Sequence, residues 1–403
     1  MIGEAWSPDW SNAVFSLAER DRRWRKAREL MARDGIDAIV CLPWTSNHDR
    51  GQADPRYLTQ LGENSDETTI VFPLDGEVTA WHSRGGVWPS SNWFTDIRAA
   101  ARGTGGASAA GRLKELRLER GTIGIAGLTG GMLSHCRITE GEQNWQSVEI
   151  IKRELPNAKV VSATDLLGEA RYQKSEAEID FLRRGTAIAD KVLGAIVEHA
   201  RPGVAERAVW AEMLATYGEA GGSFEPMFGW ISGPQGNVYH RIEQPTFRVF
   251  RPGDQLTVEI DGRWGGYIAQ IDQTFALGRA AQDLRDGMKL AYESFNRVFA
   301  ALKPGVTVGE LLEIGTVEGM GGRGVARLTM HGRGTGDDGP LVTGRLTPEL
   351  RAIEMKENCV MVIKPSATVD GKGYGGNWGE TVAIRSWGAE RLGAHPQYLY
   401  ELA

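Results

Sequence analysis

The chain has 403 residues, a formal net charge of −6 and 24% charged residues, the ordinary balance of a folded globular protein. This acidic balance argues against a nucleic-acid partner, and no apolar run approaches the roughly 18 residues of a membrane span. The N-terminal stretch lacks the apolar core of a secretory signal, and the three scattered cysteines fit a reducing compartment. We therefore expect a cytoplasmic protein.

The first part of the chain alternates helical and extended patterns. The pattern predicts a helix at 12–34, a strand at 36–44, two strands around an Asp-Gly turn at 68–83, a helix at 112–121 and a strand at 122–128. Such alternation is typical of an α/β domain with a covered sheet. We assign this domain to residues 1–168.

The sequence pattern changes after Arg171. From there on, predicted amphipathic helices are followed twice by strand-rich segments. The predicted helices are 174–203, 205–222, 283–305 and 306–320, and the strand-rich segments are 224–278 and 358–388. This order indicates two similar halves of an α+β domain, residues 169–403, with a site in the sheet between them.

Two strand patterns carry the polar residues of most interest. Side chains alternate faces along a strand, so Glu259 and Asp261 share one face, and Gln270 and Asp272 share one. The period alone does not say which face is buried, and each residue taken singly also fits a solvated surface. A functional interpretation requires these residues to converge.

A family resemblance supplies that convergence. RPGDQLTVEIDGRWGGYIAQIDQTFALG resembles the "pGDlvlvDlGaeydGYcsDitRTfalG" stretch of aminopeptidase P, prolidase, methionine aminopeptidase and creatinase. RYQKSEAEI resembles "R.iKs..Ei", MHGRGTGDDGP resembles "gHgiGl.vHE.P", NCVMVIKPSATV resembles "gMvftiEPgiy", and GNWGETVAI resembles "giriEdtvlV". The resemblance runs in family order over residues 171–390. It implies a pita-bread C-terminal domain with a creatinase-type N-terminal domain.

The metal enzymes of this family hold two divalent cations with Asp, Asp, His, Glu and Glu. The residues at those positions here are Glu259, Gln270, His331, Lys364 and Glu380. A protonated lysine has no lone pair to offer, and a neutral amide is a poorer ligand than a carboxylate. We therefore expect no metal and no other cofactor. The Lys364 ammonium is expected where a metal sat, paired with Glu259 and Glu380.

Creatinase, which lacks metals on this fold, is the more useful comparison. The resemblance places His240 at its catalytic histidine, Asp272 at its substrate-binding acid and Glu380 at its late glutamate. A histidine suits proton transfer because its pKa lies near neutrality. Two interpretations of His331 stay open. It is either a second acid/base or substrate ligand, or a packed residue left over from the metal site without a catalytic role. Asp338 stands at the peptidases' second histidine, which disfavours Xaa-Pro cleavage.

The leading interpretation is a metal-independent, creatinase-like hydrolase that cleaves a C–N bond in a small zwitterionic or anionic metabolite. The catalytic candidates are His240, Glu259, His331 and Glu380; the substrate-binding candidates are Asp272, Gln270, Lys364, Asp338, Arg50 and Arg56. The resemblance further implies a homodimer whose N-terminal domain reaches the partner's site, with no nucleic-acid or membrane partner. The alternatives are a lyase, an Xaa-Pro-type metallopeptidase and a non-catalytic binding homologue.

Overall fold

The chain forms two compact units in a computed structural model. The structure describes residues 14–43, 53–61, 68–82, 93–99, 104–134, 140–223, 226–236, 244–343 and 346–403. Unit 1 comprises Met1–Ala177 and Thr335–Gly339, and unit 2 comprises Glu178–Gly334 and Pro340–Ala403. Residue 168 lies inside helix α5 (Thr164–Tyr172), and the long segment of unit 1 ends at Ala177, so the assignment of domains to 1–168 and 169–403 stays a prediction.

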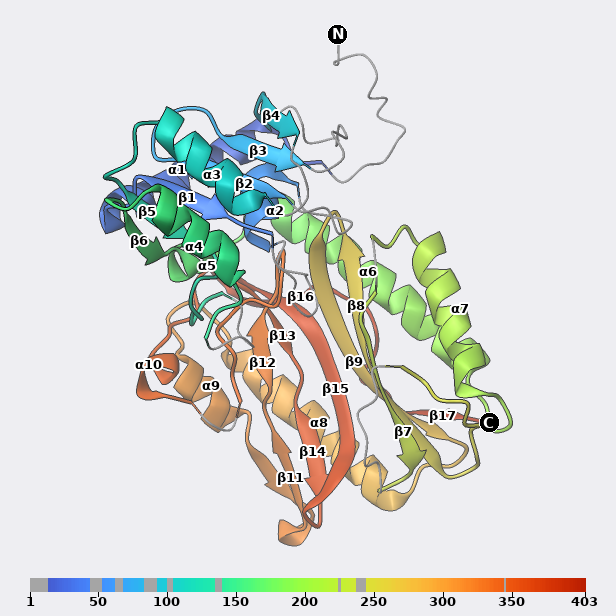
Figure 1. Cartoon of the computed structure of the whole chain (residues 1–403). Helices are drawn as coiled ribbons and strands as arrows, with labels where there is room; N and C mark the ends of the chain where they lie inside the picture. Colours follow the sequence, from blue (N-terminus) through green and yellow to red (C-terminus); the bar gives the residue numbers. More distant parts are fainter. Residues whose placement is uncertain are drawn as a thin grey trace. The chain divides into compact units, whose positions relative to one another are not determined.

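Unit 1 contains a mixed sheet with helices packed on it (Figure 1). In the described residues its strand order is β4-β3-β2-β1-β5-β6. The strands are β1 (Ala38–Cys41), β2 (Thr69–Pro73), β3 (Thr79–His82), β4 (Asp96–Ala99), β5 (Thr122–Ile125) and β6 (Lys159–Ser162). The helices are α1 (Leu17–Asp34), α2 (Ala53–Thr59), α3 (Gly105–Glu115), α4 (Trp145–Glu154) and α5.

The first helix illustrates how local sequence sets element boundaries in unit 1. Helix α1 begins later than the predicted residue 12, because the Ser16 side chain accepts a hydrogen bond from the Glu19 backbone N–H and caps the helix there. It ends at Gly35, whose left-handed backbone (φ 66°) closes it as predicted. The helix predicted at 112–121 begins earlier, at Gly105, and ends at Glu115.

Unit 2 is built on a largely antiparallel sheet, in which the short strand β17 (Tyr400–Leu402) pairs parallel with β9 (Tyr267–Leu277). Along its main path the described strands run in the order β10-β11-β14-β15-β9-β8-β7, and β12 joins through β13 to β15. The strands at the centre are β7 (Phe228–Pro234), β8 (Asp254–Trp264), β9 (Tyr267–Leu277), β12 (Met330–Gly332), β13 (Val360–Ile363) and β15 (Lys372–Arg385). The others are β10 (Val317–Gly319), β11 (Gly324–Arg327), β14 (Ser366–Val369), β16 (Gly388–Arg391) and β17 (Tyr400–Leu402).

Helices cover one face of this sheet, called here the helix face. They are α6 (Glu176–His199), whose first residues lie in unit 1, α7 (Glu206–Glu219) and α8 (Gln282–Ala301). Ile260 and Ile271 of the central strands pack with α6 and α7 in one apolar core. A Cβ on Gly262 would lie 1.8 Å from the carbonyl oxygen of Gly185, so a glycine here lets α6 pack directly against β8.

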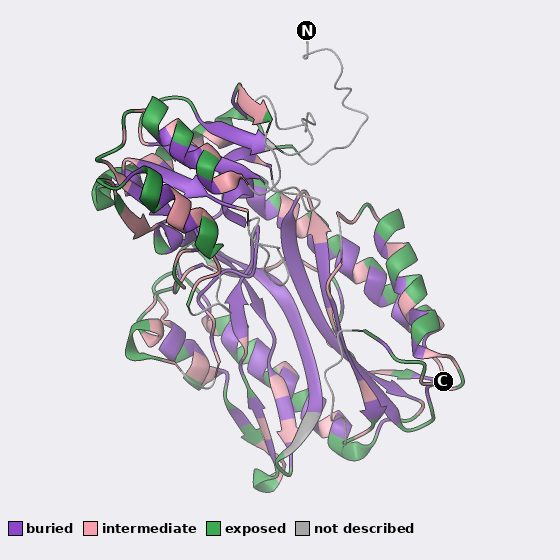
Figure 2. Cartoon of the chain, in the orientation of Figure 1, coloured by how far each residue is buried: buried purple, intermediate pink, exposed green. Residues whose placement is uncertain are grey.

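The opposite face of the central strands is polar, although it too is buried (Figure 2). In the run Leu256–Asp261 of β8, apolar residues alternate with Thr257, Glu259 and Asp261, so the polar set lies on the face away from the helices. We call this the site face. Among the described helices, none is both long enough and apolar enough to cross a membrane.

One predicted helix is shorter than expected. The pattern predicted a helix at 306–320, whereas α9 covers Val308–Ile314 and β10 follows at Val317–Gly319. Thr307 and Glu310 form a reciprocal capping box that fixes the start of α9. Beyond Gly315, the Val-Glu-Gly run of β10 pairs with β11 in the sheet, and this pairing outweighs the local helical pattern.

Candidate active site

Four of the polar residues singled out in the sequence lie side by side on β8 and β9. The strand register pairs Glu259 with Asp272 and Asp261 with Gln270. Directly paired residues point to the same face of an antiparallel sheet, so all four side chains lie on the site face. Like charges directly opposite each other are destabilising, so the Glu259 and Asp272 carboxylates require a nearby cation.

Lys364 provides a cation beside Glu259. Its Nζ lies 3.6 Å from Glu259 Oε2 and donates a hydrogen bond of 2.7 Å to Gln270 Oε1. The residue immediately follows β13, where its backbone N–H donates to Thr329 O, and its side chain is only 4% exposed. Of the two carboxylates that the sequence was expected to pair with Lys364, Glu259 is confirmed.

A chain of hydrogen bonds continues behind Lys364. Gln270 Nε2 donates to Asp261 Oδ1 at 2.9 Å, and Arg333 Nη2 donates to the same oxygen at 2.7 Å. A lysine can only donate and a carboxylate can only accept, so the Gln270 amide has one orientation that satisfies both neighbours. Asp261 and Arg333, respectively 0% and 1% exposed at their side chains, form a buried ion pair.

His331 comes from β12, where it pairs with Val362 of β13, and Val362 pairs in turn with Thr381 of β15. This register places His331 on the site face. Its Nδ1 lies 3.2 Å from the Gly332 carbonyl oxygen, and a carbonyl can only accept, so Nδ1 carries the hydrogen. In the neutral ring the lone pair is therefore on Nε2.

Glu380 lies on the other face of the sheet. In β15 it pairs with Ile271 of β9 and Ile363 of β13, whereas its neighbour Gly379 pairs with Asp272. Gly379 is thus the β15 residue beside the site, and the expected pairing of Lys364 with Glu380 is wrong. A Cβ on Gly379 would lie 2.6 Å from Lys364 Cβ, so Lys364 leaves no room for a side chain there.

Glu380 belongs to a second polar cluster, on the helix face. Arg391 Nε donates to its Oε2, and Arg391 Nη2 donates to the His395 carbonyl oxygen at 2.6 Å. The His395 ring stacks on Trp378, with its Nδ1 3.5 Å from Asp190 Oδ1 on α6. Burial raises the pKa of the Glu380 carboxyl, against the lowering effect of His395 and Arg391. The register thus places Glu380 away from the site face, and the catalytic role expected for it stays a prediction.

The donor set on the site face does not fit a two-metal centre. Gln270 and Lys364 stand at two of the family's ligand positions, and Gly379, which has no side chain, stands at a third. The Lys364 ammonium would repel a cation bound among these oxygens. Within the described ranges there is no group of three or more His, Cys, Asp or Glu residues arranged to hold a metal ion.

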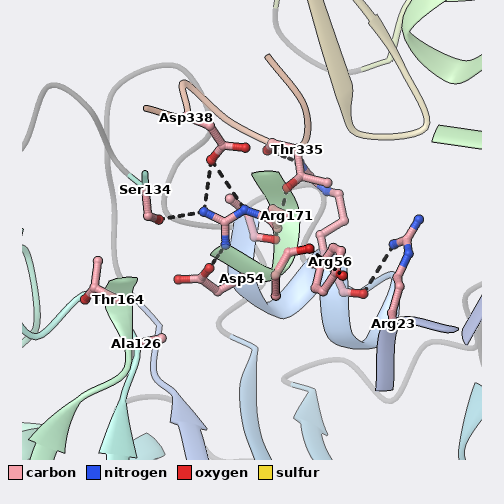
Figure 3. Close-up of polar contacts among 12 residues, drawn as sticks. Arg23, Asp54, Arg56, Ala126, Ser134, Thr164, Arg171, Thr335 and Asp338 are labelled. Atoms are coloured by element: carbon pink, nitrogen blue, oxygen red, sulfur yellow. Dashed lines mark hydrogen bonds and ion pairs between the residues drawn. The ribbon is translucent and has the colours of Figure 1, made fainter. Parts of the chain in front are cut away.

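A third buried polar cluster lies in unit 1, around Arg171 (Figure 3). The guanidinium binds the Asp54 carboxylate and donates to Ser134 Oγ at 2.6 Å and to Asp338 Oδ1 at 2.9 Å. Lys174 Nζ lies 3.9 Å from Asp338 Oδ2. Two cations thus balance two anions, all at most 3% exposed at their side chains.

This cluster includes Asp338, which was expected to bind substrate. In the structure its carboxylate is a counter-ion to Arg171, because a buried charge needs a partner, and its substrate role stays a prediction. Arg56 Nη1 lies 3.4 Å from the Thr335 carbonyl oxygen, also within unit 1, and its substrate role stays a prediction. His240 and Arg50 lie outside the described residues, so their predicted roles stay predictions as well.

Sequence reasoning missed Arg333, Arg391 and His395. Arg333 carried a signal, because it stands where the "gHgiG" motif has an apolar residue. The Glu380 error also had a signal. Matching Gly379-Glu380-Thr381-Val382 to "Edtv" of the family motif aligns the Thr-Val pair and places Gly379 at the ligand position, in agreement with the sheet register.

Comparison with solved structures supports this architecture. The chain matches an Xaa-Pro dipeptidase from Bacillus anthracis with a TM-score of 0.74 and 18% identity, covering 95% of this chain and 100% of that one. It matches the dipeptidase PepE from Mycobacterium ulcerans with a TM-score of 0.72 and 20% identity, covering 96% and 99%. At these identities the likeness shows the fold alone: a pita-bread α+β domain preceded by an N-terminal domain.

The family follows from the sequence itself. The model of metallopeptidase family M24 matches residues 180–386, half of the chain, and the chain belongs to this family. The chain is 32% identical over 178 residues to a probable dipeptidase PepE of Mycobacterium tuberculosis, a match that covers 44% of this chain and 46% of that protein. The match thus spans less than half the length of that curated relative.

Proposed function

We propose that the chain is a metal-independent hydrolase that cleaves a C–N bond in a small zwitterionic or anionic metabolite. The observation that carries this proposal is the hydrogen bond of 2.7 Å from the Lys364 ammonium to Gln270, at positions where family members bind metal with carboxylates. A hydrolase is in line with the M24 family match.

The chemistry asked of the site is the addition of water across the C–N bond. The water oxygen bonds to carbon, and its protons end on the products, one of them on the leaving nitrogen. A general base must take a proton from that water, and His331 Nε2 and the proposed His240 are the candidates. Glu259 and Asp272 would bind the cationic part of the substrate, since carboxylates form charge-assisted hydrogen bonds with such groups.

The test is a hydrolysis screen with and without metal. Purified protein is treated with a chelator and offered small zwitterionic amides, amidines and guanidino acids together with Xaa-Pro dipeptides, and amine or ammonia release is measured. We expect turnover of a small zwitterion at a rate unchanged by chelation or by added Mn²⁺. Activity that disappears on chelation and returns with Mn²⁺ would contradict the proposal.

A second candidate function is a metal-dependent dipeptidase. It is favoured by the printed names of similar proteins, the probable dipeptidase PepE and an Xaa-Pro dipeptidase. The same screen separates the two candidates, because a dipeptidase would cleave Xaa-Pro dipeptides and require the metal. Lys364 and Gly379 argue against this second candidate, since neither provides a metal ligand.

Assembly and location complete the proposal. We propose a cytoplasmic homodimer in which the N-terminal domain of one chain contributes to the site of the other. Sedimentation equilibrium at several protein concentrations tests the assembly, and a mass of one chain at all of them would rule the dimer out.

A further inference from the structure

Lys364 has an uncommon environment for a buried ammonium. It carries three N–H donors, and its hydrogen-bonded partner at 2.7 Å is the neutral Gln270 amide. The Glu259 carboxylate lies at 3.6 Å, which is beyond hydrogen-bond distance. The closest contact of the ammonium is therefore with a neutral group, and its ion pair with Glu259 is longer.

The residues behind Gln270 fix this arrangement. Arg333 donates to Asp261, and Asp261 accepts from Gln270, so the Gln270 amide oxygen is presented to Lys364. Arg333 also offsets the negative charge of Asp261, which is the anion that follows Gln270 in the series of hydrogen bonds starting at Lys364. An aspartate or glutamate in place of Gln270 would instead place a full negative charge on the ammonium and repel Asp261.

We propose that Lys364 binds a carboxylate of the ligand, and that Gln270, Asp261 and Arg333 are positioning residues that keep its charge available for that anion. The ligand is then a zwitterion, with its carboxylate on Lys364 and its cationic group beside Glu259 and Asp272. This inference rests on the proposed function for the location of the ligand, and it adds the residue that recognises the carboxylate.

The test compares two probes of the same shape, glycine betaine and betaine amide, which differ in carboxylate against carboxamide. Their dissociation constants are measured by titration calorimetry on the full chain. Wild type should bind glycine betaine more tightly than the amide. In Lys364→Met this preference should fall by ~10–100-fold, the usual effect of losing a hydrogen bond between charged groups. Lys289→Met, at an exposed lysine, should keep it.

The positioning role has its own variant. Asp261→Asn combined with Gln270→Glu moves one negative charge from residue 261 to residue 270 and keeps the total charge, with an amide and a carboxylate still facing each other. We expect a lower unfolding midpoint, because residue 261 no longer neutralises the buried Arg333. In the folded variant the preference for glycine betaine should be reduced at least ~10-fold, because the carboxylate introduced at position 270 neutralises Lys364. A purely structural role for Gln270 would leave the preference unchanged.

The two proposals fail in different ways. Equal binding of glycine betaine and betaine amide by the wild-type chain would overturn the proposal that Lys364 binds the carboxylate, and so would no measurable binding of either. The proposal would also fail if Lys364→Met or the double variant preferred glycine betaine as strongly as the wild-type chain does. If Lys364 binds the carboxylate as expected while no compound in the hydrolysis screen is cleaved, this proposal stands and the hydrolase proposal fails.

Discussion

Replacing Arg171 with methionine should lower the free energy of unfolding by about 3–5 kcal/mol, the usual cost of removing one partner from a buried ion pair. The change takes the guanidinium away from the buried Asp54 and Asp338 carboxylates and leaves Lys174 at 3.9 Å from Asp338. Methionine keeps most of the length of the side chain, so the loss reports the charge rather than a cavity. Urea unfolding followed by circular dichroism measures it.

Arg33→Met is the matched control for this prediction. Arg33 also contacts two carboxylates, those of Asp34 and Glu169, but its side chain is 51% exposed. Exposed pairs of this kind contribute about 1 kcal/mol or less. Equal effects of the two substitutions would mean that the Arg171 cluster does not stabilise unit 1 through its buried charges.

Lys364→Glu should be at least as damaging, with a loss of about 3–5 kcal/mol or more. The substitution removes the cation that lies 3.6 Å from Glu259 and adds a further carboxylate to a face that already holds Glu259, Asp261 and Asp272. Added Mn²⁺ should not restore stability, because Gly379 provides no ligand and Gln270 remains a neutral amide. The unfolding midpoint in urea, with and without Mn²⁺, is the measurement.

Lys289→Glu provides the comparison. Lys289 forms an i,i+3 pair with Asp286 on α8, and its side chain is 71% exposed, so its charge reversal should cost about 1 kcal/mol or less. If Lys364→Glu were as mild as this control, Lys364 would not be acting as the internal cation of the site. Strong stabilisation of the variant by Mn²⁺ would instead contradict the statement that Gly379 and Gln270 leave too few metal ligands.

The sequence correctly predicts which polar side chains share a face of the central strands, because side chains alternate between the two faces along a strand. Glu259 and Asp261 on one strand, and Gln270 and Asp272 on the next, share the site face because strand side chains alternate. The Asp75-Gly76 turn is equally local: β2 and β3 pair antiparallel around it, and Gly76 has a positive φ of 102°. These features depend on residues close together in the chain.

Sequence reasoning is limited where one residue of register or a long-range contact decides the outcome. A shift of one residue in β15 exchanges Gly379 for Glu380 and moves the carboxylate to the opposite face of the sheet. The role of Asp338 depends on Arg171 and Asp54, which are distant in the sequence. No local pattern indicates such a partnership, because buried charges find partners in space rather than along the chain.

Our central proposal is that an internal ammonium takes the place of the metal ions in the site of this M24 protein. It is tested most directly by the metal content of protein purified without chelator and then dialysed against manganese, zinc and iron, measured by mass spectrometry with inductively coupled plasma. We predict traces far below one ion per chain in wild type. Stoichiometric binding of any of these metals that is lost in Glu259→Gln would contradict it.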